Sequence, residues 1–187
     1  MAPKNKTTRS EIVDAALALV EKHGKDELNA RSVAKELGIS TQPIFSNFEN
    51  MDELKREVAK RATEIYLDYI KETAESGRYP AYKSSGMAYI RFAKEKRELF
   101  KLTFMDGTGR YEAEAYHSII EAMSRVNGIT LADAKELHLR MWTFVHGIAT
   151  MAATEFVDFE DEYASKMITD VYTGLITKYK KKGEENG

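Results

Sequence analysis

Apolar residues recur every three or four positions along most of the chain, whereas the strict alternation typical of strands is scarce. The first such stretch is predicted to be a helix that begins at Thr8, because "TRSE" is a capping box with Glu11 three residues after the cap. Gly24 provides a natural left-handed cap for its end. The pattern therefore predicts an all-helical fold.

Two much shorter helical patterns follow, joined by almost no linker. Asn29 caps a predicted helix over Ala30–Leu37, and Gly38 allows a tight reversal of the backbone without a Cβ penalty. Ser40 is the expected cap of the next helix, whose first turn contains Pro43, where the missing N–H costs nothing. Because such short helices are marginal alone, we expect neighbouring helices to cover them. Together they predict a helix-turn-helix unit.

A long helix is predicted next, beginning at a second capping box, "NMDE", from Asn50 to Glu53. "SGRYP" is the clearest break in the chain, so a domain boundary is expected near residues 50–80, with the long helix belonging partly to each side. Five further helical segments bring the expected count to about nine. They run roughly over Tyr82–Lys94, Glu95–Met105, Tyr111–Val126, Leu131–Phe156 and Phe159–Lys180.

Composition narrows the class of protein. The 187-residue chain is 43% hydrophobic and 31% charged, which fits a folded globular protein. With no cysteine, it has no disulfide, thiolate metal site or thiol nucleophile. The N-terminal stretch has acidic residues inside its apolar part, unlike a signal peptide, and no run approaches the ~18 apolar residues of a membrane span. We therefore expect a cytoplasmic protein without membrane contact.

The charge distribution says little about a partner. The net charge of −2 argues against a general polyanion binder, and residues 1–46 carry seven basic residues against six acidic ones. Lys4, Lys6 and Arg9 form a short basic arm without an acidic residue among them. Such an arm suits phosphate contact, but a merely solvated tail explains it equally well.

The second short helix is predicted to leave small or polar side chains exposed, with Ile44, Phe45 and Phe48 on its apolar side. Small and polar groups can enter a DNA major groove and contact base edges or phosphates. The uncharged amide of Gln42 favours base reading, although an ordinary helical corner fits the spacing as well. The exposed residues are Thr41, Gln42, Pro43, Ser46 and Asn47.

Residues 1–55 resemble the DNA-binding domain of the TetR family of transcriptional regulators. "IVDAALALVEKHG", "SVAKELGIS" and "IFSNFENMDEL" occur in that family's order and spacing. The resemblance implies a homodimer that binds a palindromic operator in double-stranded DNA and that an effector bound in the C-terminal domain releases. It divides the chain into a helix-turn-helix DNA-binding domain at residues 1–52, a ligand-binding and dimerisation domain at 53–180, and a flexible tail at 181–187.

The same resemblance assigns DNA contacts. Phe45 stands where a tyrosine is usual and lacks the hydroxyl that reaches a phosphate, so it either packs or contacts a thymine methyl group. Met51 replaces a common lysine, and Glu49 adds a negative charge nearby, so fewer phosphate contacts are expected, with backbone amides and the basic arm supplying more. The predicted DNA-contacting residues are Arg31, Ser40, Thr41, Gln42, Pro43, Phe45 and Asn47.

The C-terminal half carries a shorter resemblance. "RMWTFVHGIATM" resembles a Trp-His-Gly pattern in some TetR-type proteins, and "RELFKLTFM" is similar to a stretch in the same subgroup. Family members dimerise by pairing their last two helices, which are amphipathic here, although several of the apolar residues could equally be intrachain core. The predicted dimer residues are Met141, Phe144, Val145, Ile148, Met167, Val171 and Leu175.

Aromatic residues and methionines are frequent between residues 66 and 123. They suit a pocket for an apolar or aromatic effector, while plain core packing is the alternative for most of them. His146 either lines that pocket or is a hydrogen-bonded core histidine. The predicted pocket residues are Tyr66, Tyr69, Tyr89, Phe92, Phe104, Met123, Trp142 and His146.

No catalytic constellation is recognisable. "EAYH", from Glu114 to His117, is a Glu-x-x-His pair, but a di-iron site in a helical bundle needs a second copy and two more glutamates. Phosphate-binding glycine loops and the common hydrolase motifs are missing from the sequence. We therefore predict a protein that is not an enzyme and needs no cofactor or metal.

Two hypotheses remain: a dimeric, ligand-responsive DNA-binding regulator, expected to be a repressor, and a helical ligand-binding protein without sequence-specific DNA binding.

Overall fold

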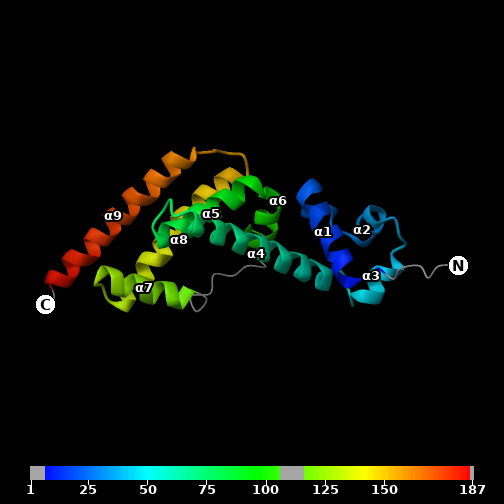
Figure 1. Cartoon of the computed structure of the whole chain (residues 1–187), viewed down its shortest axis with the longest axis horizontal. Helices are drawn as coiled ribbons and strands as arrows, with labels where there is room; N and C mark the ends of the chain where they lie inside the picture. The colour runs from blue at the N-terminus through cyan, green and yellow to red at the C-terminus, as the bar shows by residue number, and fades with distance from the viewer. Residues whose placement is uncertain (1–6, 106–115, 186–187) are drawn as a thin grey trace. The chain divides into compact units, whose positions relative to one another are not determined.

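The computed structural model describes residues 7–105 and 116–185, with side chains up to Lys180. Every regular element within these residues is a helix, which confirms the all-helical prediction (Figure 1). Two short segments of other helical type accompany the α-helices: a 3₁₀ turn, η1 (Lys25–Glu27), and a π-helical segment, η2 (Lys101–Met105). The described α-helices are α1 (Arg9–His23), α2 (Ala30–Leu37), α3 (Gln42–Asn47), α4 (Met51–Glu75), α5 (Ala81–Glu95), α6 (Arg97–Phe100), α7 (His117–Asn127), α8 (Leu131–Ala153) and α9 (Asp161–Glu185).

The chain forms two compact units. Among the described residues, the first comprises residues 7–67 and 96–105, and the second comprises residues 68–95 and 116–185. The division falls inside α4, which therefore contributes residues to both units, as the sequence suggested. It lies after Leu67, and the return of the α6–η2 segment to the first unit had no counterpart in the sequence prediction.

The first unit is built around α1, which packs against α2, α3 and α6. The predicted capping box is present: the Thr8 hydroxyl oxygen accepts from the backbone N–H of Glu11, and the backbone N–H of Thr8 donates to the Glu11 carboxylate at 2.7 Å. The core-facing stripe of α1 is fully buried at Ile12, Ala16 and Val20. Its apolar face thus supplies the surface on which the short helices dock.

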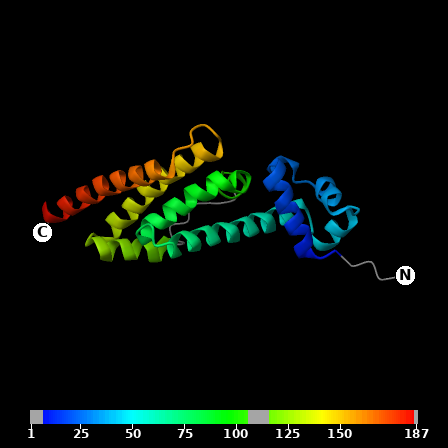
Figure 2. The ribbon, with the colours of Figure 1, turned by 45° about the horizontal axis from the view of Figure 1, so that its top comes forward.

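The second unit centres on α8, which packs against α5, α7 and α9 (Figure 2). The pairing of α5 with α8 is close, because a Cβ atom added at Gly86 would lie 3.5 Å from the Val145 side chain. Phe92 from α5 and Leu137 from α8 are fully buried in this core. A long, largely apolar α8 is therefore enclosed on several sides, as its composition requires.

Several helix ends differ from the sequence prediction. The segment predicted as one helix over Glu95–Met105 divides into α6 and η2, and α8 ends at Ala153 instead of Phe156, just before Glu155 adopts a left-handed φ of 56°. α9 continues to Glu185, beyond the predicted end at Lys180. Residues 111–115 of the predicted seventh helix, residues 186–187 of the predicted tail and Glu114 of "EAYH" lie outside the described residues.

The cap at Gly24 also differs from the prediction. Gly24 has a positive φ of 84°, but its ψ of 168° is not the left-handed helical conformation that was expected. At Gly128, by contrast, φ and ψ are 65° and 36°, so this glycine caps α7 in the left-handed conformation. The 3₁₀ turn η1 follows directly after Gly24.

Candidate nucleic-acid interface and ligand cavity

The helix-turn-helix unit has the local structure that the sequence predicted. α2 spans Ala30–Leu37, and the side-chain oxygen of Asn29 accepts from the backbone N–H of Ser32 at 3.0 Å. Gly38 has φ 65° and ψ 31°, the left-handed conformation that a side chain disfavours. Asn29 caps α2 through its side chain and Gly38 through its backbone, so together they fix where α2 begins and ends.

The start of α3 differs by one residue. The backbone N–H of Ile44 donates to the Thr41 carbonyl at 3.1 Å, so Thr41 rather than Ser40 is the cap, and its side chain makes no capping hydrogen bond. Pro43 is the second helical residue, where it loses no hydrogen bond. The predicted first-turn position of Pro43 is therefore confirmed, while the cap assigned to Ser40 is wrong.

Ile44 alone among the residues of α3 is buried, at 1% exposure. Phe45 is 53% exposed and does not belong to the buried side, contrary to the prediction. Position 44 points to the core and position 45, about 100° further round the helix, does not. α3 thus presents Gln42, Phe45 and Ser46 to solvent, while Thr41, Pro43 and Asn47 are only partly exposed.

Asn47 is held by the protein itself. Its amide nitrogen donates to the Pro43 carbonyl at 2.7 Å and to the Thr7 carbonyl at 3.5 Å. A contact from this nitrogen to a phosphate would have to replace one of these bonds. Of the other predicted DNA-contacting residues, Ser40 and Arg31 are exposed.

Arg9 fastens the end of α3 to the start of α4. One guanidinium nitrogen donates to the Asn47 carbonyl at 2.6 Å, and another forms ion pairs with Glu53 at 2.7 Å and with Glu57 at 3.3 Å. The guanidinium also lies 4.2 Å from the centroid of the Phe48 ring. Sequence reasoning placed Arg9 in a basic arm and missed this role, because its partners lie 38 to 48 positions away. Lys4 and Lys6 lie outside the described residues.

The capping box predicted at the start of α4 is only half formed. The Asn50 side chain accepts from the backbone N–H of Glu53 at 2.9 Å, but the Glu53 carboxylate accepts from the backbone N–H of Glu49, at 2.6 Å. That hydrogen bond, followed by the one from Arg9, lowers the pKa of Glu53. The carboxylate therefore joins the α3–α4 loop to Arg9.

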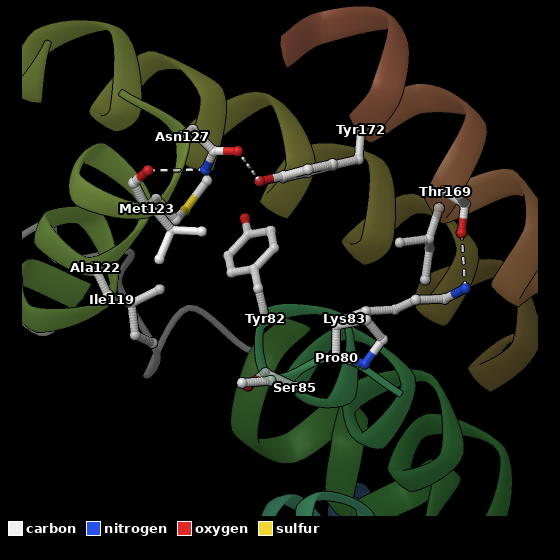
Figure 3. Close-up of a pocket in the computed structure, with 13 residues that line it drawn as sticks. Pro80, Tyr82, Lys83, Ser85, Ile119, Ala122, Met123, Asn127, Thr169 and Tyr172 are labelled. Atoms are coloured by element: carbon white, nitrogen blue, oxygen red, sulfur yellow. Dashed lines mark hydrogen bonds between the residues drawn. The ribbon is translucent and has the colours of Figure 1, made fainter. Parts of the chain in front are cut away.

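A cavity of about 570 Å³ lies in the second unit between α5, α7 and α9 (Figure 3). Its walls include Ile119, Met123 and Val126 from α7 and Ile168 from α9. Tyr82, from the first turn of α5, projects between α7 and α9. Of the eight residues predicted to form a pocket, only Met123 lines this cavity.

Polar groups in the cavity wall are mostly joined to one another. The Tyr172 hydroxyl donates to the Asn127 side-chain oxygen at 3.1 Å, and the Asn127 amide nitrogen donates to the Met123 carbonyl at 2.8 Å. The Lys83 ammonium donates to the Thr169 hydroxyl at 2.7 Å. The Tyr172–Asn127 bond links α9 to α7, the Asn127–Met123 bond lies within α7, and the Lys83–Thr169 bond links α5 to α9 (Figure 3).

The other predicted pocket residues lie elsewhere. Tyr69, Tyr89 and Phe92 are buried in the core of the second unit. Tyr66 and Phe104 belong to the first unit, where their rings meet edge to face at 5.2 Å. Aromatic residues suit a helical core as well as a pocket wall, so composition could not separate the two.

Trp142 and His146 form a ring stack instead. The two rings lie 5.0 Å apart and are nearly parallel, at 6°. The Tyr89 hydroxyl and Nδ1 of His146 are within hydrogen-bonding distance at 2.9 Å, and burial lowers the pKa of the His146 imidazole. In this structure His146 is a hydrogen-bonded histidine between α5 and α8 and does not line the cavity.

Residues predicted to form a dimer interface divide into two groups. Met141, Val145 and Ile148 are buried within this single chain, because α8 uses that face against its own neighbours. The remaining four, which are partly exposed, are Phe144, Met167, Val171 and Leu175.

Within residues 7–105 and 116–185, no group of three or more histidine, aspartate or glutamate side chains is arranged to hold a metal ion. In the same part of the chain, no helix is both long and apolar enough to cross a bilayer.

Solved structures with the same fold include a candidate transcriptional regulator from Pseudomonas aeruginosa PAO1, with a TM-score of 0.68 at 14% identity, covering 90% of this chain and 89% of that one. BioQ matches with a TM-score of 0.55 at 20% identity, over 90% of this chain and 98% of its own. BioQ in complex with its natural double-stranded DNA operator matches with a TM-score of 0.53 at 18% identity, over 91% and 98%. None of the curated proteins matches the chain.

Two family descriptions match the sequence itself. Residues 12–62 match "Bacterial regulatory proteins, tetR family", and residues 83–171 match "Tetracyclin repressor-like, C-terminal domain". The first covers the helix-turn-helix unit with the beginning of α4, and the second covers α5 to the middle of α9. The chain belongs to the TetR family of regulatory proteins.

Proposed function

We propose that this protein is a dimeric, sequence-specific DNA-binding regulator of transcription, and that it is a repressor which a small molecule releases from a palindromic operator. The observation that carries this proposal is α3, which is docked through the buried Ile44 and presents Gln42, Phe45 and Ser46 outward. A short helix held on one side and exposed on the other is what a major groove can accept.

The outward side chains suit base reading. The Gln42 amide can both donate and accept, which matches the N6 and N7 edge of adenine, and the exposed Phe45 ring suits a thymine methyl group. Arg31 is exposed at the start of α2 and can contact a phosphate. The similarity to BioQ, whose structure contains its double-stranded DNA operator, supports DNA as the ligand of this fold.

A second copy of the chain completes the reading surface. The four partly exposed residues Phe144, Met167, Val171 and Leu175 lie on α8 and α9 and are the candidates for pairing these helices across a two-fold axis. Two-fold symmetry would place two copies of α3 about one DNA turn apart. The operator is therefore expected to be palindromic.

For an effector bound in the second unit to release DNA from the first, some part of the chain must couple the two units. α4 contributes to both units, and the α6–η2 segment, which follows α5 directly in sequence, packs against α1 in the first unit. Lys96 pairs with Glu21 of α1, and the Glu98 carboxylate lies 3.0 Å from where a Cβ atom of Gly24 would be. We propose that an effector acts by shifting α4 and the α6–η2 segment. A ligand shifts the equilibrium between two conformations of a protein only when it binds one of them more tightly.

Selection of bound duplexes from a randomised DNA pool at moderate salt, followed by sequencing, tests this proposal. We expect an enriched palindrome whose half-sites lie about one DNA turn apart. No enrichment from a folded, ligand-free dimer would instead support a helical ligand-binding protein without sequence-specific DNA binding. A light-scattering mass taken on the same sample separates failure to dimerise from failure to read DNA.

A further inference from the structure

The cavity between α5, α7 and α9 combines apolar walls with a single charge. Its volume of about 570 Å³ lies in the range usual for small-molecule sites, ~300–1,000 Å³. Ile119, Met123, Val126 and Ile168 provide apolar surface. Among the described residues that line the cavity, Lys83 is the only one that carries a charge. Such walls suit the apolar body of a ligand, and the lysine suits an anionic end.

The Lys83 ammonium has N–H donors available to bind an anion. Its side chain is partly buried, and its ammonium donates to one neutral acceptor, the Thr169 hydroxyl. Asp170 acts on Lys83 through its charge alone, without a hydrogen bond to the ammonium. The Tyr79 ring centroid lies 5.4 Å from the ammonium. Because an ammonium has three N–H donors, two remain for a ligand.

Partial burial makes the charge of Lys83 less favourable than it is in water. Desolvation lowers the pKa of the Lys83 ammonium, which means that the protein holds the charged form less readily than water does. A bound anion would offset that desolvation through a charge-assisted hydrogen bond. The neighbouring Tyr172 and Asn127 are already bonded to each other, so they do not compete for the same ligand group.

We propose that this cavity binds an amphipathic monocarboxylate, with its hydrocarbon body against α7 and α9 and its carboxylate paired with Lys83. The inference rests on the proposed function, in which a small molecule regulates the protein, and names the chemical class of that molecule. One ammonium without a guanidinium fork matches a single negative charge better than a doubly charged phosphate ester, which Arg residues bind in bidentate fashion. A cationic or strongly polar ligand does not fit these walls.

Calorimetric titration of the DNA-free, full-length protein tests the inference. The probes are octanoate, decanoate and dodecanoate, with decanol and decylamine as head-group controls. We expect carboxylates to bind more tightly than the alcohol of equal length, and the amine not to bind. Lys83→Met, which keeps the apolar stem, should weaken carboxylate binding about tenfold or more and leave decanol within about twofold. Lys166→Met, at an exposed position of α9 outside the cavity, is the matched control and should change nothing.

A second variant tests the cavity rather than the charge. Ala122 lines the cavity from α7, and Ala122→Phe should fill it and weaken decanoate and decanol alike. Circular dichroism spectra and melting curves identify any variant that fails to fold, in which case Ser85→Phe, from the α5 wall, replaces it. The inference is overturned if no carboxylate binds the wild type, if the amine binds as well as the carboxylate, or if the lysine variant binds carboxylate unchanged. Because DNA is absent, these outcomes are independent of operator binding, which a separate titration of the selected duplex measures.

Discussion

Truncation of Ile44 tests how α3 is held in place. Ile44 is 1% exposed and is the only residue within α3 that is buried, so the docking of this short helix depends on it. Ile44→Ala removes three carbons, and at about 0.8 kcal/mol per buried CH₂ the transfer term alone is about 2.4 kcal/mol. The space left behind adds to this, within the ~2–5 kcal/mol found for such substitutions. Ile44→Val removes one carbon and should cost about 0.8 kcal/mol.

Native-state hydrogen exchange measures this effect where it arises. The Phe48 amide donates to the Ile44 carbonyl at 2.9 Å and reports the last turn of α3. If burial of Ile44 holds α3, its amides should exchange about fifty-fold faster or more in Ile44→Ala and about fourfold faster in Ile44→Val. Gln42→Ala, exposed on the same helix and without a side-chain hydrogen bond among the described residues, is the control and should leave α3 near its wild-type exchange rates.

Exchange of α3 at the wild-type rate in Ile44→Ala would show that Ile44 does not hold this helix. Equal acceleration of amide exchange in α8, in the other unit, would show that the loss of stability is global rather than local. A graded response confined to α3 would show that one buried side chain keeps the proposed reading helix in place.

Three further outcomes follow from the described contacts. Arg9→Met should weaken binding to the selected duplex and lower the melting temperature of the protein, because it removes the link from α1 to Asn47 and Glu53; equal melting curves would contradict this role. Gly38→Ala should destabilise the protein by roughly 1–2 kcal/mol in denaturant titrations, because at φ 65° the backbone is in the left-handed conformation that side chains disfavour. An added Cβ would meet nothing within 4 Å, so no steric clash adds to this cost. Gly38→Asn should cost less, because asparagine adopts the left-handed conformation more readily than alanine. Burial lowers the pKa of His138 and His146 below 6.5, so the unfolded chain binds protons there that the folded chain does not. The free energy of unfolding should therefore fall as the pH drops below about 6.5, and the double glutamine variant should show a shallower pH dependence between pH 7.5 and 5.5; an unchanged slope would count against the histidines.

Local features of the fold were predictable because their causes are local. α2 begins and ends where Asn29 and Gly38 place it, and the Thr8 capping box needs only residues three positions apart. The cap of α3 was misplaced by one residue because Ser40 and Thr41 are both good capping residues by type. Only the backbone hydrogen bonds decide between them.

Features that depend on packing were not predictable. Arg9 finds its partners on α3 and α4, far along the chain, and no periodicity signals that contact. The cavity joins Tyr82, Val126 and Tyr172, which lie on three different helices. An aromatic-rich stretch indicates only that rings will be buried, not whether a space remains between them.

Core and interface residues are also alike in sequence. Met141, Val145 and Ile148 follow the same helical spacing as Phe144, yet the first three are buried within the chain. The hydrophobic pattern reports that a face avoids water, but not whether its own chain or a second copy covers it. Only the packing of α8 against α5, α7 and α9 separates these residues.

The most direct test of the central claim is to repeat the selection from random DNA with Gln42→Ala beside the wild type. Gln42 is exposed on α3 and makes no side-chain hydrogen bond within the described residues, so its loss should not alter folding. Reading by α3 predicts that base preference relaxes at one position of each half-site while the rest of the palindrome is still selected. An unchanged base preference at every position, from a variant with wild-type helicity and mass, would show that this side chain does not read the operator.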